Sequence, residues 1–166
     1  MSSDMPVNKL DASGIVAFDL IDYKPDLEVV VFDIREHLYM EMIIKEKEFR
    51  ESVGKMDYTA FHGKAVAVIC SVDAIIPPWV YMIIGERLHA YAAYLSFKDP
   101  VELETELWAM NVNNVDLSAY KDQKVVVRAR AGIPPALYML AAKRLAPFVK
   151  TLMYGEVGMP KVIYKK

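Results

Sequence analysis

The sequence predicts an α/β protein, a mostly parallel sheet flanked by helices. Short apolar runs bounded by turn residues alternate with helical segments along the chain, and one stretch around a Pro-Pro pair occurs twice. The 166 residues are 54% hydrophobic and 25% charged, which is typical of a folded globular chain. We therefore expect a single domain over residues 1–166, with an internally duplicated βαβ half and an antiparallel N-terminal edge strand.

The duplication rests on a match without gaps between residues 76–99 and residues 133–156. Eight of the 24 aligned pairs are identical, where ordinary composition would give roughly one or two. Upstream the match resumes after a small gap, so the half-repeats cover about 57–98 and 116–155. Each copy is predicted to contain a strand, a loop, a helix and a second strand.

The Pro-Pro pairs predict where two helices begin. Proline suits the first helical turn, where a backbone N–H would have no partner, so we expect helices to start near Pro78 and Pro135. The apolar runs before them, 65–70 and 125–130, have the pattern of buried parallel strands. The loop after the first of these strands is the longer one.

The rest of the chain fills in the alternation. The segment 15–20 is predicted as a strand that turns at 23–26 to pair antiparallel with a strand at 29–34. An amphipathic helix is expected over 36–53. A second helix is expected to open at Asp99, which would cap it, and to continue to about residue 110.

Composition excludes several classes of protein. The net charge of −2 argues against a nucleic-acid binder. No apolar run reaches the roughly 20 residues of a membrane span, and no signal-peptide pattern opens the chain, so we expect a cytoplasmic protein with no membrane partner. One cysteine excludes an intramolecular disulfide, and the three histidines lack metal-ligand spacing, so no metal site is predicted. The sequence leaves the cofactor unknown.

A candidate ligand site follows from the topology. Ligands of open α/β sheets bind outside the carboxyl ends of the strands. Alignment of the two copies pairs Cys70 with Arg130, so the two loop systems are expected to face each other across one pocket. The predicted ligand-binding residues are Cys70, Ser71, Asp73, Arg128 and Arg130.

Three functions stay open at this point. The first is small-ligand binding in that pocket. The second is an enzyme with Cys70 as nucleophile, Arg130 lowering its pKa and the 71–74 amides stabilising an oxyanion. The third is a non-catalytic interaction module, and the high apolar content predicts a homo-oligomer. Simpler interpretations remain: Cys70 as a small buried residue and Asp73 as a loop cap.

Four short sequence motifs precede the C-terminal VIYKK: FDI at 32–34, IIKEKEFRE at 43–51, CS-x-DAI-x-P at 70–77 and LMYGE at 152–156. This set resembles an uncharacterised bacterial family, domain-of-unknown-function family 2480, over about residues 8–166. The resemblance implies no particular activity or cofactor.

Members of that family look as if they carry further cysteines after the second-copy strand and after the terminal Gly-Glu. With Cys70, such a set would suggest a metal or redox cluster. This chain has Ala-Arg-Ala at 129–131 and Val-Gly at 157–158 instead. The resemblance therefore implies no such cluster in this chain, and if an ancestor had one, Cys70 is its remnant.

Overall fold

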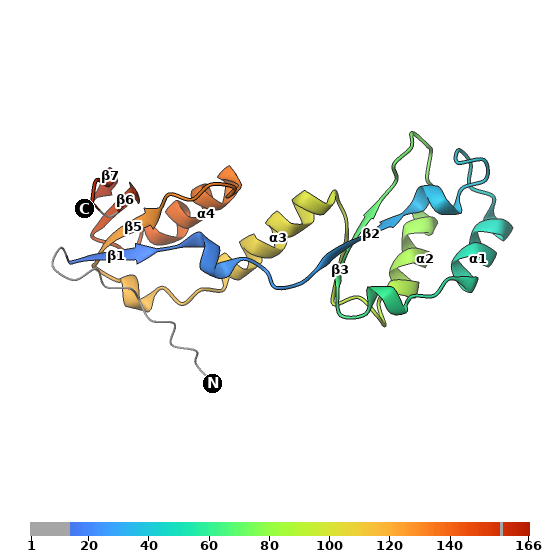
Figure 1. The fold of residues 1–166 in the computed structure, drawn as a ribbon, viewed down its shortest axis with the longest axis horizontal. Helices are drawn as coiled ribbons and strands as arrows, with labels where there is room; N and C mark the ends of the chain where they lie inside the picture. Colours follow the sequence, from blue (N-terminus) through green and yellow to red (C-terminus); the bar gives the residue numbers. More distant parts are fainter. Residues whose placement is uncertain (1–13, 157) are drawn as a thin grey trace. The chain divides into compact units, whose positions relative to one another are not determined.

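The structure is a computed structural model that describes residues 14–156 and 158–166, and it confirms the α/β class. The chain divides into two compact units, each with its own sheet (Figure 1). Unit 1 consists of residues 1–25 and 105–166, and unit 2 of residues 26–104. Unit 2 is thus an insertion between the first strand of unit 1 and the rest of that unit.

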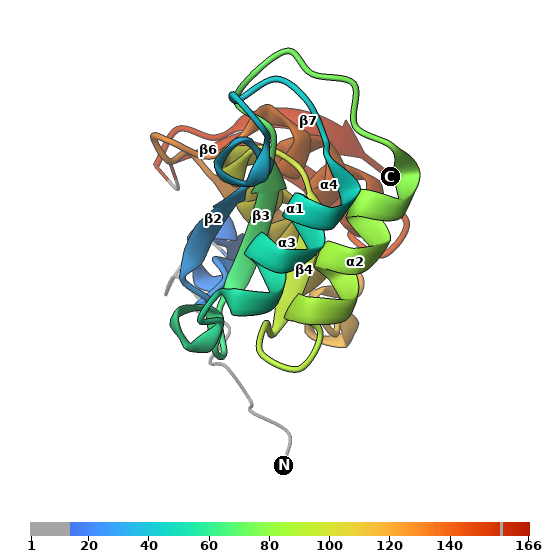
Figure 2. The same cartoon turned by 90° about the vertical axis from the view of Figure 1, so that its right-hand side faces the viewer.

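Unit 2 has a three-stranded parallel sheet in the order β2-β3-β4. Phe32 of β2 and Val68 of β3 point into a core that also contains Phe49 and Ile84 from two helices. Figure 2 shows these helices, α1 and α2, on one face of the sheet. The elements are β2 (Val29–Asp33), η2 (Ile34–His37), α1 (Glu46–Lys55), η3 (Thr59–Phe61), β3 (Ala65–Ile69), α2 (Pro78–Leu88) and β4 (Tyr94–Phe97).

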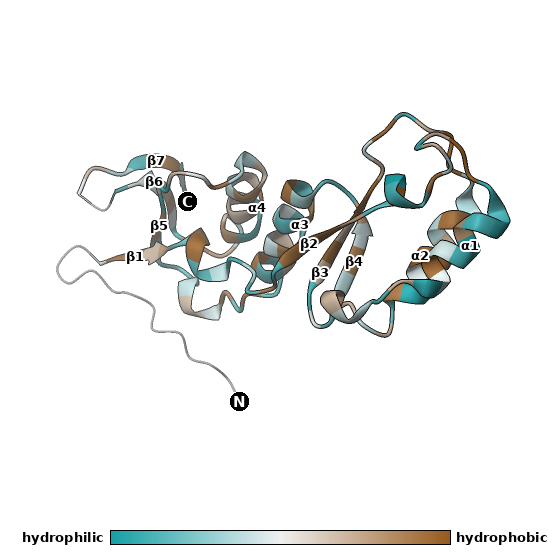
Figure 3. Ribbon diagram, turned by 45° about the vertical axis from the view of Figure 1, so that its right-hand side comes forward, coloured by the Kyte–Doolittle hydropathy of each residue, from teal (hydrophilic) through white to brown (hydrophobic). Residues whose placement is uncertain are grey.

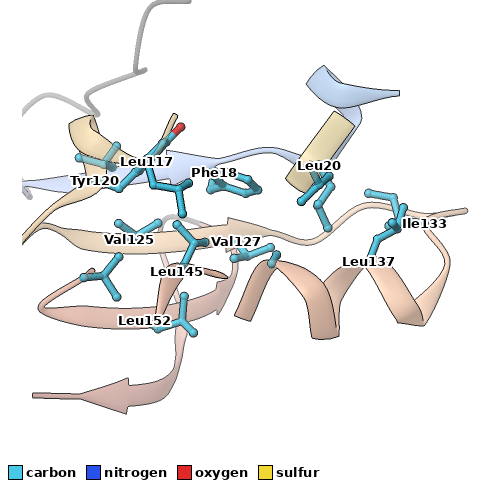
Figure 4. Packing of buried hydrophobic residues seen from close by; sticks show 14 of the residues in the cluster. Phe18, Leu20, Leu117, Tyr120, Val125, Val127, Ile133, Leu137, Leu145 and Leu152 are labelled. Atoms are coloured by element: carbon cyan, nitrogen blue, oxygen red, sulfur yellow. The ribbon is translucent and has the colours of Figure 1, made fainter. Parts of the chain in front are cut away.

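Unit 1 has a four-stranded sheet in the order β1-β5-β6-β7, in which only β7 is antiparallel to its neighbour. Its core joins Phe18 of β1, Val127 of β5 and Leu137 of α4 (Figure 4). The elements are β1 (Ile15–Phe18), η1 (Leu20–Tyr23), η4 (Ser118–Tyr120), β5 (Lys124–Arg128), α4 (Pro135–Leu145), β6 (Thr151–Gly155) and β7 (Lys161–Lys165).

Helix α3 (Pro100–Asn113) is hydrogen-bonded to the segment that follows β1. The Asp99 carboxylate accepts the amide of Val101 at 2.9 Å, so the predicted cap is confirmed. In unit 1, the Trp108 indole N–H donates to the Leu20 carbonyl at 2.8 Å, and this bond is buried. These two residues are 88 positions apart.

The predicted sheet arrangement is wrong in two respects. The strands form two sheets rather than one, and each sheet has a separate core. The N-terminal strand β1 is indeed at an edge, but it pairs parallel with β5 and not antiparallel with β2. The turn predicted at 23–26 fails to form a hairpin because the chain passes there from unit 1 into unit 2. The antiparallel edge strand is β7, which the sequence analysis missed.

The helix predicted over 36–53 begins only at Glu46. Before it, η2 ends at His37 and a tight hairpin is closed by a β-bridge between Tyr39 and Ile43. Met40 and Glu41 have φ angles of +50° and +57°, a backbone conformation incompatible with a right-handed helix. Both helices at the Pro-Pro pairs begin where predicted, at Pro78 and Pro135.

The two units share one order of elements, strand, 3₁₀ helix, α-helix, 3₁₀ helix, strand, α-helix and strand, if α3, which begins in unit 2, is counted with unit 1. Unit 1 has β7 in addition. The match extends to single hydrogen bonds. Gly63 and Asp122 both have positive φ, and their amides donate to the carbonyls of Tyr91 and Phe148 at 2.9 and 2.8 Å. The common origin of the units stays a prediction.

The structure also shifts the expected alignment of the copies by one residue. Ala65 opens β3 opposite the first residue of β2, and Lys124 opens β5 opposite the first residue of β1. Counting from these positions, Arg130 corresponds to Ser71 rather than to Cys70. The difference in length lies in the loop before each second helix, eight residues in unit 2 and six in unit 1.

Replacing Trp108 by Phe should lower the free energy of unfolding by about 1–2 kcal/mol, because the Leu20 carbonyl loses its buried donor. Urea denaturation followed by far-UV circular dichroism measures this. Trp79→Phe is the matched control, since Trp79 packs beside Phe49 and donates no hydrogen bond among the described residues. Equal losses in the two variants would contradict the role given to the Trp108 bond.

Candidate functional site

The carboxyl ends of β1 and β5 bring one carboxylate and two guanidinium groups together. Asp19 directly follows β1, and its side chain is 10% exposed. Arg130 donates two hydrogen bonds to Oδ2 of this carboxylate, from Nη2 at 2.5 Å and from Nε at 3.1 Å. Nη1 of Arg128 lies 3.8 Å from the same oxygen. Asp19 is thus shared by both arginines.

Local structure explains why Asp19 is held there. Phe18 and Leu20 on either side of it are both buried in the unit 1 core (Figure 4). The Asp19 Oδ1 accepts the amide of Ile21 at 3.3 Å and so caps η1. A short polar side chain at this position satisfies a backbone donor that the 3₁₀ helix leaves unpaired.

Arg130 is fixed from the other side by α4. The hydroxyl of Tyr138 accepts the amide of Arg130 at 3.2 Å and donates to the carbonyl of Arg130 at 3.1 Å. Its ring packs edge-on against Tyr154 of β6, with ring centroids 5.6 Å apart. The backbone and the guanidinium of Arg130 therefore both have defined positions.

Two carboxylates of unit 1 respond oppositely to this environment. Burial by itself raises the pKa of Asp19, but the hydrogen bonds from Arg130 and Ile21 and the charges of both arginines outweigh it, so the pKa is lowered. The pKa of Asp22 is raised, first by burial and then by the negative charge of Asp19. Asp19 is accordingly ionised throughout the neutral range.

The site has hydrogen-bond donors that find no acceptor within residues 14–156 and 158–166. Nε of Arg128 is buried and has no partner within the described residues. The amides of residues 131–133, in the turn where Gly132 takes a φ of +77°, also donate to no described protein atom. An unpaired buried donor costs about 1–3 kcal/mol, and native structures usually supply a water, ion or ligand at such places.

At the equivalent place in unit 2, no guanidinium of the described residues donates a hydrogen bond to the aspartate. Asp33 caps η2 by accepting the amide of Arg35 at 3.0 Å and also accepts the amide of Ser71 at 3.1 Å. Burial by itself raises the pKa of Asp33. Hydrogen bonds from Ser71 and the Arg35 amide lower that pKa by more than burial raises it, so the net shift is downward. The Arg35 guanidinium turns away to Glu41, at 2.8 Å.

Cys70 and Asp73 lie in the loop that follows β3. Cys70 is half-buried against the unit 2 core, and its thiol donates to the carbonyl of Val72 at 3.3 Å. Asp73 is exposed. His37 is occupied elsewhere: its ring stacks on Phe32, its Nδ1 lies 2.7 Å from Ser52 Oγ, and burial lowers its pKa.

The five predicted site residues therefore fall into two groups. Arg128 and Arg130 meet at Asp19 in unit 1, whereas Cys70, Ser71 and Asp73 belong to unit 2. A single pocket lined by all five stays a prediction. Sequence analysis missed Asp19, although the words Phe-Asp-Leu at 18–20 and Phe-Asp-Ile at 32–34 are a signal that links it to Asp33.

The comparison with known families agrees with the resemblance drawn from the sequence. The family described as Protein of unknown function (DUF2480) matches residues 4–166. The chain belongs to this family. No curated protein and no solved structure matches this DUF2480 chain.

Two further findings concern partners of the DUF2480 protein. Within residues 14–156 and 158–166, no three His, Cys, Asp or Glu side chains are grouped so that they could hold a metal ion. No helix of this part of the chain is both long enough and apolar enough to span a bilayer.

Asp19→Asn should lower the free energy of unfolding at pH 7 by about 1–3 kcal/mol, because both arginines lose their shared counter-charge. The lowered pKa makes this stabilisation fully present above the ordinary aspartate pKa of about 3.9 and lost as pH falls through the folded-state value. Urea unfolding at several pH values should therefore show the difference from wild type shrinking only below about pH 4.

The matched control is Asp33→Asn, which changes the equivalent cap in unit 2 where no guanidinium binds the carboxylate. We expect a smaller loss of stability from this variant. A loss as large as that of Asp19→Asn would show that capping, and not the arginine pair, accounts for the effect.

Proposed function

We propose that this DUF2480 protein binds a small anion, carrying a carboxylate or phosphate group, at the carboxyl ends of β1 and β5. The observation that carries the proposal is Arg128: its Nε is buried beside the Asp19–Arg130 pair and has no hydrogen-bond partner among the residues that the structure describes. Guanidinium groups recognise such anions through two parallel N–H bonds.

The geometry of the pair suits recognition of an incoming anion. Asp19 occupies Nε and Nη2 of Arg130, so the remaining face of that guanidinium stays available. The side chains of Arg128 and Arg130 are 32% and 41% exposed, which leaves both within reach of solvent. Asp19 contacts both guanidinium groups and holds them in place before binding, which reduces the entropic cost of binding.

The arginines carry the binding in this proposal, and the Pro-Pro turn does not. Helix N-termini attract anions through free backbone N–H groups. Pro134 and Pro135 have no such group, so α4 offers fewer donors than a glycine-rich phosphate loop. The amides of 131–133, which donate to no described protein atom, lie before the prolines and supply the backbone contribution instead.

Isothermal titration with inorganic phosphate and with succinate tests the proposal and distinguishes the two kinds of anion. We expect wild-type protein to bind at least one of them at millimolar or lower concentration, and Arg128→Gln to weaken that binding at least tenfold. Arg35→Gln is the matched control, because Arg35 is an exposed arginine of unit 2 paired with Glu41. Binding that is absent in wild type, or weakened equally by both variants, would refute the proposal.

Catalysis by Cys70, the alternative drawn from the sequence, has weaker support. The thiol donates to a backbone carbonyl, and within the described residues no histidine or arginine bonds to it. We expect iodoacetamide to label native Cys70 slowly at and below pH 7, and quickly only after unfolding in urea. Rapid labelling of the native protein below pH 7, measured by mass spectrometry, would restore the enzyme hypothesis.

Three further expectations belong with this proposal. The repeated order of elements and the equivalent hydrogen bonds of the two units support an origin by internal duplication. The single cysteine supports a cytoplasmic location. The net charge of −2 supports a ligand other than nucleic acid.

A further inference from the structure

We infer that unit 2 carries an interface for a second copy of this chain, at the end of its sheet where the loops after β2 and β3 emerge. Five large apolar side chains point outward there. They form what we call the apolar tip: Tyr39, Met40, Met42, Ile43 and Ile75. Figures 1 and 2 both show the two loops beside each other, and Figure 3 shows hydrophobic stretches in them.

Backbone hydrogen bonds close the hairpin of the apolar tip. The amide of Tyr39 donates to the Ile43 carbonyl at 2.8 Å, and the amide of Met42 donates to the Tyr39 carbonyl at 3.1 Å. Met40 and Glu41, between them, both have positive φ, as in the type I′ turn that normally selects Asn-Gly. Strain at non-glycine residues is retained mainly where function needs the conformation. This turn holds Met40 73% exposed.

The same two loops also bury apolar side chains. Both loops are therefore packed against the core, and their other apolar side chains are exposed in a defined backbone conformation. Leu38 and Ile44 flank the hairpin and pack into the unit 2 core. In the second loop, Ala74 and Ile76 pack into that core while Ile75 between them is 94% exposed. Inward and outward side chains are thus separated on both loops.

The area of the apolar tip fits a protein interface. The exposed fractions of its residues amount to about three fully exposed large side chains, or roughly 500 Å². A standard interface buries about 800 Å² on each partner, so the apolar tip supplies more than half of that requirement and its polar surroundings can supply the rest.

The charges around the apolar tip favour a second copy as the occupant. Arg35 and Glu41 form an exposed ion pair at 2.8 Å, and Lys45 lies over the ring of Tyr39 at 3.2 Å. With Glu36 and Asp73 nearby in sequence, both signs are present. A twofold contact brings each patch against itself, and a rim of mixed sign is complementary to its own copy. An anionic membrane would instead require an excess of lysine and arginine.

Sedimentation velocity of the full chain between 1 and 100 µM tests the inference. We expect a monomer–dimer equilibrium in wild type, and a dissociation constant at least tenfold higher in Met40→Glu and in Ile75→Glu. Met82→Glu is the matched control: Met82 lies on α2 of the same unit, is 75% exposed, and should leave the dissociation constant unchanged. Because these side chains are exposed, we expect all three variants to fold.

A double variant, Met40→Asn with Glu41→Gly, provides an independent test. It gives the type I′ turn its preferred residues, so the melting temperature should rise while dimerisation weakens. A wild-type protein that stays monomeric at 100 µM would overturn the inference and leave a different protein or a membrane as the occupant. A dimer disrupted equally by Met82→Glu and Met40→Glu would overturn it as well.

Discussion

One constraint recurs in both units: the aspartate at the carboxyl end of the first strand receives hydrogen bonds from the loop that follows the neighbouring strand. In unit 1, Asp19 receives two donors from Arg130, and in unit 2, Asp33 receives the amide of Ser71. Each aspartate also caps a 3₁₀ helix. This tie fixes where the first two strands end relative to each other, and thus shapes the edge from which the loops emerge.

The different ways of meeting that constraint give the two units different chemistry. In unit 1 the partner of the aspartate is an arginine, and a second arginine, Arg128, lies beside the same carboxylate. The buried Nε of Arg128 has no acceptor among the described residues. In unit 2 the partner of the aspartate is a backbone amide, and the Arg35 guanidinium pairs with Glu41 instead. We therefore propose an anion site at this end of unit 1, and a protein interface at the apolar tip of unit 2.

Local signals in the sequence predicted those features that depend on neighbouring residues. The Pro-Pro pairs located the starts of α2 and α4, and Asp99 located the start of α3, because caps and first-turn prolines act within a few residues. The hairpin at 39–43 escaped prediction because Met and Glu rarely adopt positive φ, so amphipathic spacing there indicated a helix.

Features that depend on distant residues could not be predicted in this way. Whether β1 pairs with β2 or with β5 is decided by packing between segments about 110 positions apart, and no pattern near residue 15 reports it. The same holds for Asp19, whose partner Arg130 lies 111 positions away. The position of Arg128 and Arg130 at a strand end predicted them as site residues. Nothing in the sequence predicted that Asp19 binds both.

The most direct test of this account is nuclear magnetic resonance of the arginine Nε–Hε groups, assigned with the Arg128→Gln and Arg130→Gln variants. In the free protein, the Arg130 signal should exchange slowly with water and lose that protection in Asp19→Asn. Addition of phosphate or succinate should then shift the Arg128 signal. A rapidly exchanging Arg130 signal, or an Arg128 signal that neither anion moves, would contradict the account.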